Sequence, residues 1–220
     1  MNNVKTHVYF MPGMAASSLI FDNIKLSGND FEVHYLKWII PHKNETLESY
    51  TLRLLEDIKH KNPVLIGVSF GGILVQEMAK HIHAKKVIII SSVKSNKELP
   101  KRMLIAKYTG IYKVLPTRLV NNIEMLPKYA FGKKVVKRLA LYEKYLSVRD
   151  KYYLDWAIRQ IVNWQQSEAD PKTIHIHGEK DPVFPVKHIS GCTIIKGGTH
   201  IMIIDKYKWF NENLPKIILS

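Results

Sequence analysis

The stretch of sequence that decides the fold runs from Pro63 to His81 and reads PVLIGVSFGGILVQEMAKH. Its first part, through Val68, is an apolar run with the length of a buried strand, and its last part, from Ile73, has the spacing of a helix. Between them lies Gly67-Val68-Ser69-Phe70-Gly71, a G-x-S-x-G pattern. A serine on a very sharp turn needs neighbours without side chains two residues before and after it, because otherwise the strand and the helix collide. The pattern predicts such a turn, and an ordinary strand-to-helix turn with a capping serine is the alternative.

Two later segments supply what a serine nucleophile lacks. Residues 173–178 form one predicted strand, which Asp181 follows, and residues 192–196 form another, which His200 follows after Gly197-Gly198-Thr199. Open sheets of parallel strands place their sites just past the carboxyl ends of the strands. The sequence therefore predicts that a carboxylate and an imidazole meet Ser69 at one edge of a sheet.

The order Ser69, Asp181, His200 and the context of each residue resemble the α/β-hydrolase family over nearly the whole chain. The resemblance implies that Ser69 is the nucleophile, His200 the base and Asp181 the acid that orients the base. It also implies an oxyanion hole made by the backbone N–H groups of Met14 and Phe70.

The acid has two rivals in the sequence. Glu179 lies in the same turn as Asp181, and Asp205 lies in the predicted last helix, while the Asp181-Pro182 pair could simply form a turn. Asp181 matches the family spacing and is the predicted acid. The end of the preceding strand, Ser91-Ser92-Val93-Lys94, offers no carboxylate.

Predicted strands and helices alternate along the chain. This alternation indicates an α/β fold with a mainly parallel sheet of about six strands, helices on both faces and a helical cap. Three predicted strands are runs of Val, Ile and Leu without alternation, as expected when helices cover both faces. The first strand already resembles the family's third, so the usual antiparallel pair is missing. Further predicted strands are 7–11, 31–38, 64–68 and 87–91, and the predicted helices are 17–26, 47–59, 73–81 and 201–213. We expect one domain, 1–220, with residues 94–170 as a helical cap insertion.

Composition sets bounds on the kind of protein. A chain of 220 residues with 46% hydrophobic and 24% charged residues can form one soluble core without a second domain. A single cysteine, Cys192, excludes an internal disulfide, and its predicted strand suggests a buried thiol. The N-terminus enters a strand without an apolar signal-peptide core, so we expect a cytoplasmic location.

The net charge of +14 is concentrated in one segment. Residues 94–151 contain 15 Lys and Arg against four acids. Such a segment could recruit an acidic carrier or an anionic lipid surface, and a merely solvated lysine-rich surface is the alternative. No nucleic-acid motif accompanies the charge, so we expect no nucleic-acid partner.

The remaining histidines and aromatics predict no further chemistry. The pairs His81-x-His83 and His175-x-His177 lack a third ligand at a suitable spacing, so we expect no metal and no cofactor. An aromatic group lies at roughly helical spacing, and packing of the cap explains it at least as well as a substrate-binding role does; its members are Tyr152, Tyr153, Trp156 and Trp164.

The resemblance predicts a serine hydrolase that cleaves a carboxylic ester or a thioester through an acyl-enzyme. Two alternatives stay open: an acyltransferase or lyase with the same triad, and a non-catalytic protein that binds a ligand on the same fold. The sequence identifies neither the natural substrate nor the oligomeric state.

Overall fold

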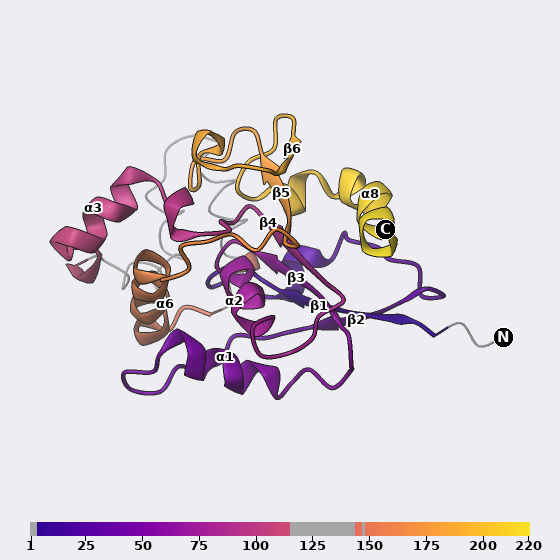
Figure 1. The fold of residues 1–220 in the computed structure, drawn as a ribbon, viewed down its shortest axis with the longest axis horizontal. Helices are drawn as coiled ribbons and strands as arrows, with labels where there is room; N and C mark the ends of the chain where they lie inside the picture. Colours follow the sequence, from indigo (N-terminus) through magenta and orange to yellow (C-terminus); the bar gives the residue numbers. More distant parts are fainter. Residues whose placement is uncertain (1–3, 115–143, 147) are drawn as a thin grey trace.

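In a computed structural model, which describes residues 4–114, 144–146 and 148–220, the chain forms a six-stranded, all-parallel sheet (Figure 1). The strand order is β2-β1-β3-β4-β5-β6. The strands are β1 (Thr6–Met11), β2 (Phe31–Tyr35), β3 (Val64–Val68), β4 (Lys86–Ile90), β5 (Ile174–Gly178) and β6 (Thr193–Ile195). The predicted fold class is confirmed for the described residues.

Helices cover both faces of this sheet, as the unalternating strands predict. The helical elements are η1 (Ser18–Phe21), α1 (Leu47–Leu55), α2 (Phe70–Met78), η2 (Asn96–Glu98), α3 (Lys101–Thr109), η3 (Ile111–Val114), α6 (Lys151–Asn163), η5 (Val186–His188), α7 (Met202–Asp205) and α8 (Tyr207–Leu219). Buried side chains of α1, α2 and α6 form one core with the sheet, and those of η1, α7 and α8 form the other. All five residues of β3 are buried between the two.

The predicted helices 17–26 and 201–213 differ most from the structure. Residues 17–26 contain only the single 3-10 turn η1, because Asp22 and Asn23, which favour turns, follow it directly. The predicted last helix, 201–213, is divided at Lys206, whose φ of −109° and ψ of 23° leave the helical region. Asp205 therefore ends the short helix α7 rather than lying inside a long one.

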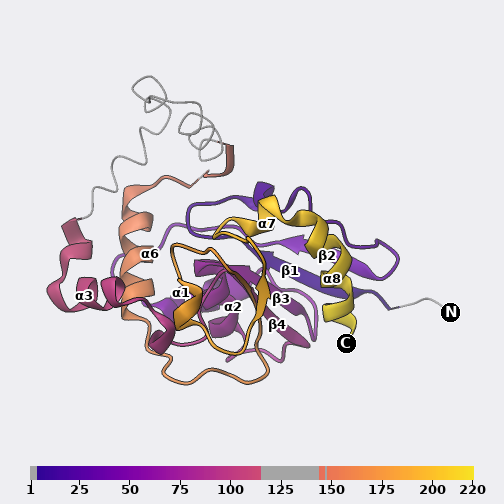
Figure 2. The same ribbon diagram turned by 90° about the horizontal axis from the view of Figure 1, so that it is seen from above.

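The predicted cap region contributes α3 and α6, which lie at the end of the molecule away from the two termini (Figure 2). Two indole N–H groups fix α6 and its end to the sheet domain: Trp156 donates to the carbonyl of Glu45 at 2.8 Å, and Trp164 donates to Glu77 Oε1 at 2.7 Å. Tyr153 is also buried, whereas Tyr152 is exposed. Three of the four aromatic residues therefore pack the predicted cap region against the rest of the domain. Residues 115–143, which include much of the basic segment, lie outside the described residues.

One smaller expectation also differs from the structure. Cys192 is half-buried and precedes β6, so its thiol is not a core residue. Among the described residues, no helix combines the length and the apolar character needed to cross a membrane.

Candidate active site

Ser69 occupies the sharp turn that the sequence predicts. β3 ends at Val68, α2 begins at Phe70, and Ser69 between them has a φ of 54° and a ψ of −120°. A non-glycine residue with a positive φ is strained and persists only where its surroundings impose that conformation. The turn thus fixes the serine between the end of a buried strand and the N-terminus of a helix.

The two glycines of the motif allow this turn because no side chain fits at either position. A Cβ on Gly67 would lie 2.2 Å from the carbonyl oxygen of Gly71, and a Cβ on Gly71 would lie 2.4 Å from that of Pro12. Both obstacles are backbone atoms, so they cannot rotate away. The crowding inferred from the sequence is therefore a direct contact between strand, helix and the loop after β1.

We expect Gly67→Ala to lower the free energy of unfolding by about 3 kcal/mol, the upper end of typical over-packing costs. Gly28→Ala is the matched control, because nothing lies within 4 Å of the Cβ it would add. Urea unfolding followed by circular dichroism measures both changes. Equal stability of the two variants would contradict the steric account of the turn.

Hydrogen bonds from three elements hold the backbone of Ser69. The Ser92 hydroxyl donates to the Ser69 carbonyl at 2.7 Å, and the Gly72 N–H donates to the same oxygen at 2.9 Å. The Ser69 N–H donates to the carbonyl of Ile90 at 2.9 Å. Ser92 lies just past the end of β4, and no sequence motif singles it out.

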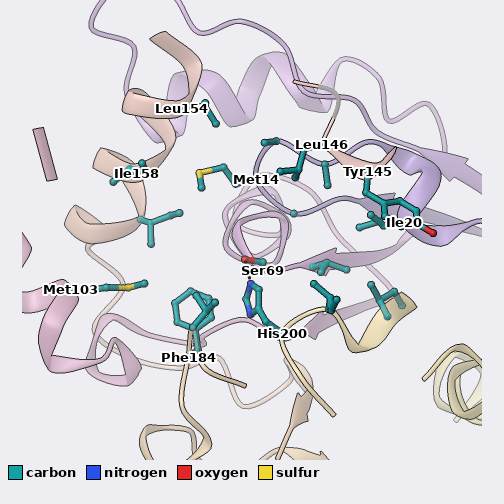
Figure 3. Close-up of a pocket in the computed structure, with 18 of the residues that line it drawn as sticks. Met14, Ile20, Ser69, Met103, Tyr145, Leu146, Leu154, Ile158, Phe184 and His200 are labelled. Atoms are coloured by element: carbon teal, nitrogen blue, oxygen red, sulfur yellow. Dashed lines mark hydrogen bonds between the residues drawn. The ribbon is translucent and has the colours of Figure 1, made fainter. Parts of the chain in front are cut away.

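The structure brings the three predicted side chains into one hydrogen-bonded chain. His200 Nε2 lies 3.0 Å from Ser69 Oγ, and His200 Nδ1 lies 2.9 Å from Asp181 Oδ2 (Figure 3 shows the first contact). The Asp181 side chain is fully buried, while 21% of the His200 side chain is exposed. This arrangement lets an imidazole take a proton from the serine while a buried carboxylate holds its other nitrogen.

Asp181 is held in position by the loop that follows it. Its Oδ1 accepts the N–H groups of Val183 at 2.7 Å and Phe184 at 3.0 Å, which leaves Oδ2 for His200. The rival carboxylates lie elsewhere: Glu179 accepts the Gly197 N–H, and Asp205 is exposed. The described residues thus offer His200 a single carboxylate partner, Asp181.

Behind this loop lies a pair of buried histidines. Burial lowers the pKa of His175 to about 3 and also lowers that of His177, so both rings are neutral at pH 7. His175 Nε2 lies 3.0 Å from His177 Nδ1, and His177 Nε2 donates to the carbonyl of Phe184 at 2.8 Å. Sequence reasoning weighed this pair only as metal ligands, whereas the structure shows it supporting the Asp181 loop. The other pair, His81 and His83, is exposed.

The loop after β1 reaches the serine. A Cβ on Gly13 would lie 3.5 Å from Ser69 Cβ, and the Gly13 carbonyl accepts the indole N–H of Trp38 at 2.9 Å and the Ala16 N–H at 3.0 Å. Met14 follows in this loop and lines the same cavity as Ser69. Phe70 is the first residue of α2, so its N–H has no acceptor one turn earlier in the helix.

A cavity of about 690 Å³ opens above Ser69 and His200. Its volume falls within the range of small-molecule sites, and its described lining is mainly apolar. Figure 3 shows Met103 and Ile158 on one side of Ser69 and Ile20 and Tyr145 on the other. Arg102 is the charged residue at its edge, and its guanidinium donates to the carbonyls of Pro182 and Val183, both at 2.6 Å. The described lining contains no carboxylate, and His200 is its one imidazole, so it offers no cluster of metal ligands.

Sequence comparisons identify no relative of this chain. No family model matches it, and no curated protein matches it.

Solved structures, by contrast, show the fold. A hydrolase from Pseudomonas aeruginosa aligns with a TM-score of 0.68 at 14% identity, over 98% of this chain and 90% of that one. A bromoperoxidase from Bacillus anthracis aligns with a TM-score of 0.67 at 17% identity, over 99% of this chain and 93% of that one. A thermophilic esterase from Thermogutta terrifontis aligns with a TM-score of 0.63 at 15% identity, over 99% of this chain and 91% of that one. With the parallel sheet described above, these similarities show that the chain has the α/β-hydrolase fold.

Proposed function

We propose that this protein is a serine hydrolase that cleaves carboxylic esters or thioesters of apolar acyl groups through a covalent acyl-enzyme. The observation that carries the proposal is the hydrogen-bonded series Ser69, His200 and Asp181 at the floor of an apolar cavity. Similar folds among hydrolases and esterases support it, although fold alone does not define an activity.

The proposed reaction begins with attack of Ser69 Oγ on the acyl carbon. His200 Nε2 accepts the serine proton as the new C–O bond forms, and it returns that proton to the leaving alcohol or thiol as the ester bond breaks. Water then attacks the acyl-enzyme, giving its proton to the same nitrogen, and the acid leaves as Ser69 regains its hydrogen. Asp181 accepts a hydrogen bond from the Nδ1–H of His200 without taking its proton, and its negative charge stabilises the imidazolium.

Backbone N–H groups stabilise the oxyanion in this proposal. The Phe70 N–H lies at the first position of α2, where the helix dipole adds partial positive charge. The Met14 N–H is the second donor, because its loop lies against Ser69 through Gly13. Loss of one such donor typically costs about 10²–10³ in rate, so both amides matter to the proposed chemistry.

The cavity favours an uncharged, apolar substrate. Side chains from η1, α3 and α6 line it, and these elements lie on both sides of Ser69 (Figure 3). An ester has an acyl part and an alcohol part that extend in different directions from the reacting carbon. We therefore propose that one apolar side of the cavity binds the acyl part of the ester and the other side binds the alcohol part. Each additional buried CH₂ is worth about 0.8 kcal/mol, or about four-fold in kcat/KM.

The test uses two series of esters, one with a growing acyl chain and one with a growing alcohol chain. Wild-type kcat/KM should rise with chain length in both. Met103→Trp, which narrows the α3 side, should reduce kcat/KM about 10-fold or more for the longest member of one series only. Methyl acetate, which does not reach that side, should react as before.

Ile105→Trp is the matched control, because Ile105 lies on the same helix, is 59% exposed and is not among the cavity residues. It should leave both series unchanged. A rate that is independent of chain length, or an equal loss for every ester in Met103→Trp, would contradict the assignment of the cavity.

Recruitment of an acidic carrier or an anionic lipid by the basic segment stays a proposal. Lys133, Lys134, Lys137 and Arg138, which would carry much of it, lie outside the described residues. Of the described cations, Lys97 pairs with Glu168 at 2.7 Å, and Lys94 donates to the Gly191 carbonyl at 3.1 Å.

A further inference from the structure

Three histidines and a glutamate converge at a place that the proposed reaction does not use. His7 belongs to β1, Glu32 and His34 belong to β2, and His60 lies in the connection between α1 and β3. In the parallel register His7 lies beside Glu32, and Tyr9 lies beside His34. Residues two apart on a strand point to the same face, so β1 and β2 present all of these side chains together. His7 lies near the amino-terminal end of β1, whereas Ser69 follows the carboxyl end of β3.

The ligand atoms lie nearly as close together as a bound metal ion requires. His7 Nδ1 lies 3.2 Å from His34 Nε2, and the Glu32 carboxylate oxygens lie 3.8 Å from the former and 3.7 Å from the latter. One donor atom from each of the four residues lies within 4.8 Å of all the others. Tetrahedral zinc with bonds of about 2.0–2.1 Å separates its ligand atoms by about 3.3 Å. The cluster is therefore close to the size of a four-coordinate site.

Tyr9 supplies the outer contact that metal-binding histidines usually have. Its hydroxyl oxygen lies 2.6 Å from His60 Nδ1 and accepts the Lys59 N–H at 3.1 Å. This contact engages Nδ1 and leaves Nε2 of His60 for an ion. When zinc occupies Nε2, Nδ1 carries the ring hydrogen and donates it in a hydrogen bond to the Tyr9 oxygen, which holds the ring in that tautomer. The Tyr9 ring is buried, so its position is set by the core.

The ligand types select the ion. Three imidazoles and one carboxylate suit zinc, whereas magnesium and calcium prefer oxygen ligands alone. The His7 and His34 side chains are 23% and 25% exposed and that of Glu32 is 51% exposed, which leaves an entry path from solvent. We propose that His7, Glu32, His34 and His60 form a structural zinc site that joins β1, β2 and the α1–β3 connection. All four ligands come from the protein, so the ion has no open position for catalysis.

The experiment uses untagged full-length protein that has been stripped with a chelator and then titrated with zinc. We expect one zinc ion per chain by elemental analysis, and visible bands typical of four-coordinate cobalt when Co²⁺ replaces zinc. Zinc at about 100 times its dissociation constant should raise the melting temperature by about 5–10 °C. Absence of stoichiometric zinc binding to the folded protein would overturn the proposal.

Variants distinguish zinc binding at this cluster from zinc binding by other histidines. Glu32→Gln changes little in shape at a half-exposed side chain and should weaken zinc binding at least about 10-fold, and His7→Gln with His34→Gln should abolish the stoichiometric site. Tyr9→Phe should weaken binding about 10-fold while keeping all four ligands. His81→Gln with His83→Gln, at the exposed pair, should bind zinc as the wild type does.

Equal zinc affinity in Glu32→Gln, Tyr9→Phe and the wild type would overturn the site, as would loss of binding in the His81 and His83 variant. If the double histidine variant fails to fold, Glu32→Gln and Tyr9→Phe still test the zinc site. Ester hydrolysis measured alongside keeps this proposal separate from the proposed function, because the zinc results stand whether or not the protein hydrolyses esters.

Discussion

Replacing Ser69 with alanine is expected to lower ester hydrolysis by a factor of about 10⁴ or more and to abolish labelling by a fluorophosphonate probe. The structure gives the physical reason. Ser69 Oγ is the atom that His200 Nε2 contacts at 3.0 Å, and alanine leaves that base without a nucleophile to activate. Removal of Oγ breaks no backbone contact of the turn, so the variant should fold as the wild type does.

Ser49→Ala is the matched control, because Ser49 is an exposed serine on α1. It should be labelled and should hydrolyse esters at the wild-type rate. Full esterase activity in Ser69→Ala would contradict the serine mechanism. A folded wild-type protein that is never labelled and hydrolyses no ester would favour the ligand-binding alternative. Formation of a new ester when an alcohol is added would instead favour acyl transfer.

The fold was predictable because its signals are local. The unalternating runs at β3 and β4 indicate strands buried on both faces, and the structure shows them at the centre of the sheet. The turn at Ser69 was equally readable, since its two glycines form a local sequence pattern, although Gly71 is also required by a contact with the distant loop after β1. Helix ends were harder to place: α1 begins where predicted, after its cap Thr46, but ends four residues before the predicted end.

The supports of the candidate site were not predictable, because they depend on contacts between distant segments. Ser92, just past the end of β4, donates to the Ser69 carbonyl, and His177 supports the loop of Asp181 through the carbonyl of Phe184. Neither contact has a sequence pattern. The cavity lining combines η1, α3 and α6, whose inward residues depend on how the cap packs.

The histidine cluster shows the same limit. Sequence spacing drew attention to pairs two residues apart, whereas His7, His34 and His60 are separated by more than 20 residues each. Only the pairing of β1 with β2 and the return of the chain after α1 bring them together. A histidine on a strand edge carries no local sign that its partners belong to other elements.

The second large effect is expected for Asp181→Asn, which should lower kcat by a factor of about 10³–10⁴ while the fold stays intact. Oδ1 of Asp181 accepts two N–H groups, from Val183 and Phe184. In the asparagine variant the amide oxygen must take that place, because an NH₂ group there would face two donors. The NH₂ group is then turned towards His200 Nδ1, which lies 2.9 Å from Oδ2 in the wild type.

An NH₂ group facing Nδ1 forces that nitrogen to accept a hydrogen bond, so the proton of the neutral ring moves to Nε2. A protonated Nε2 cannot take the proton of Ser69, and the imidazolium also loses its charged partner. The loss should therefore fall on kcat and on the rate of fluorophosphonate labelling, with little change in KM. Asp205→Asn is the control, because that carboxylate is exposed at the end of α7 and should be neutral within about two-fold. A greater loss in Asp205→Asn than in Asp181→Asn would show that another carboxylate orients His200 during the reaction.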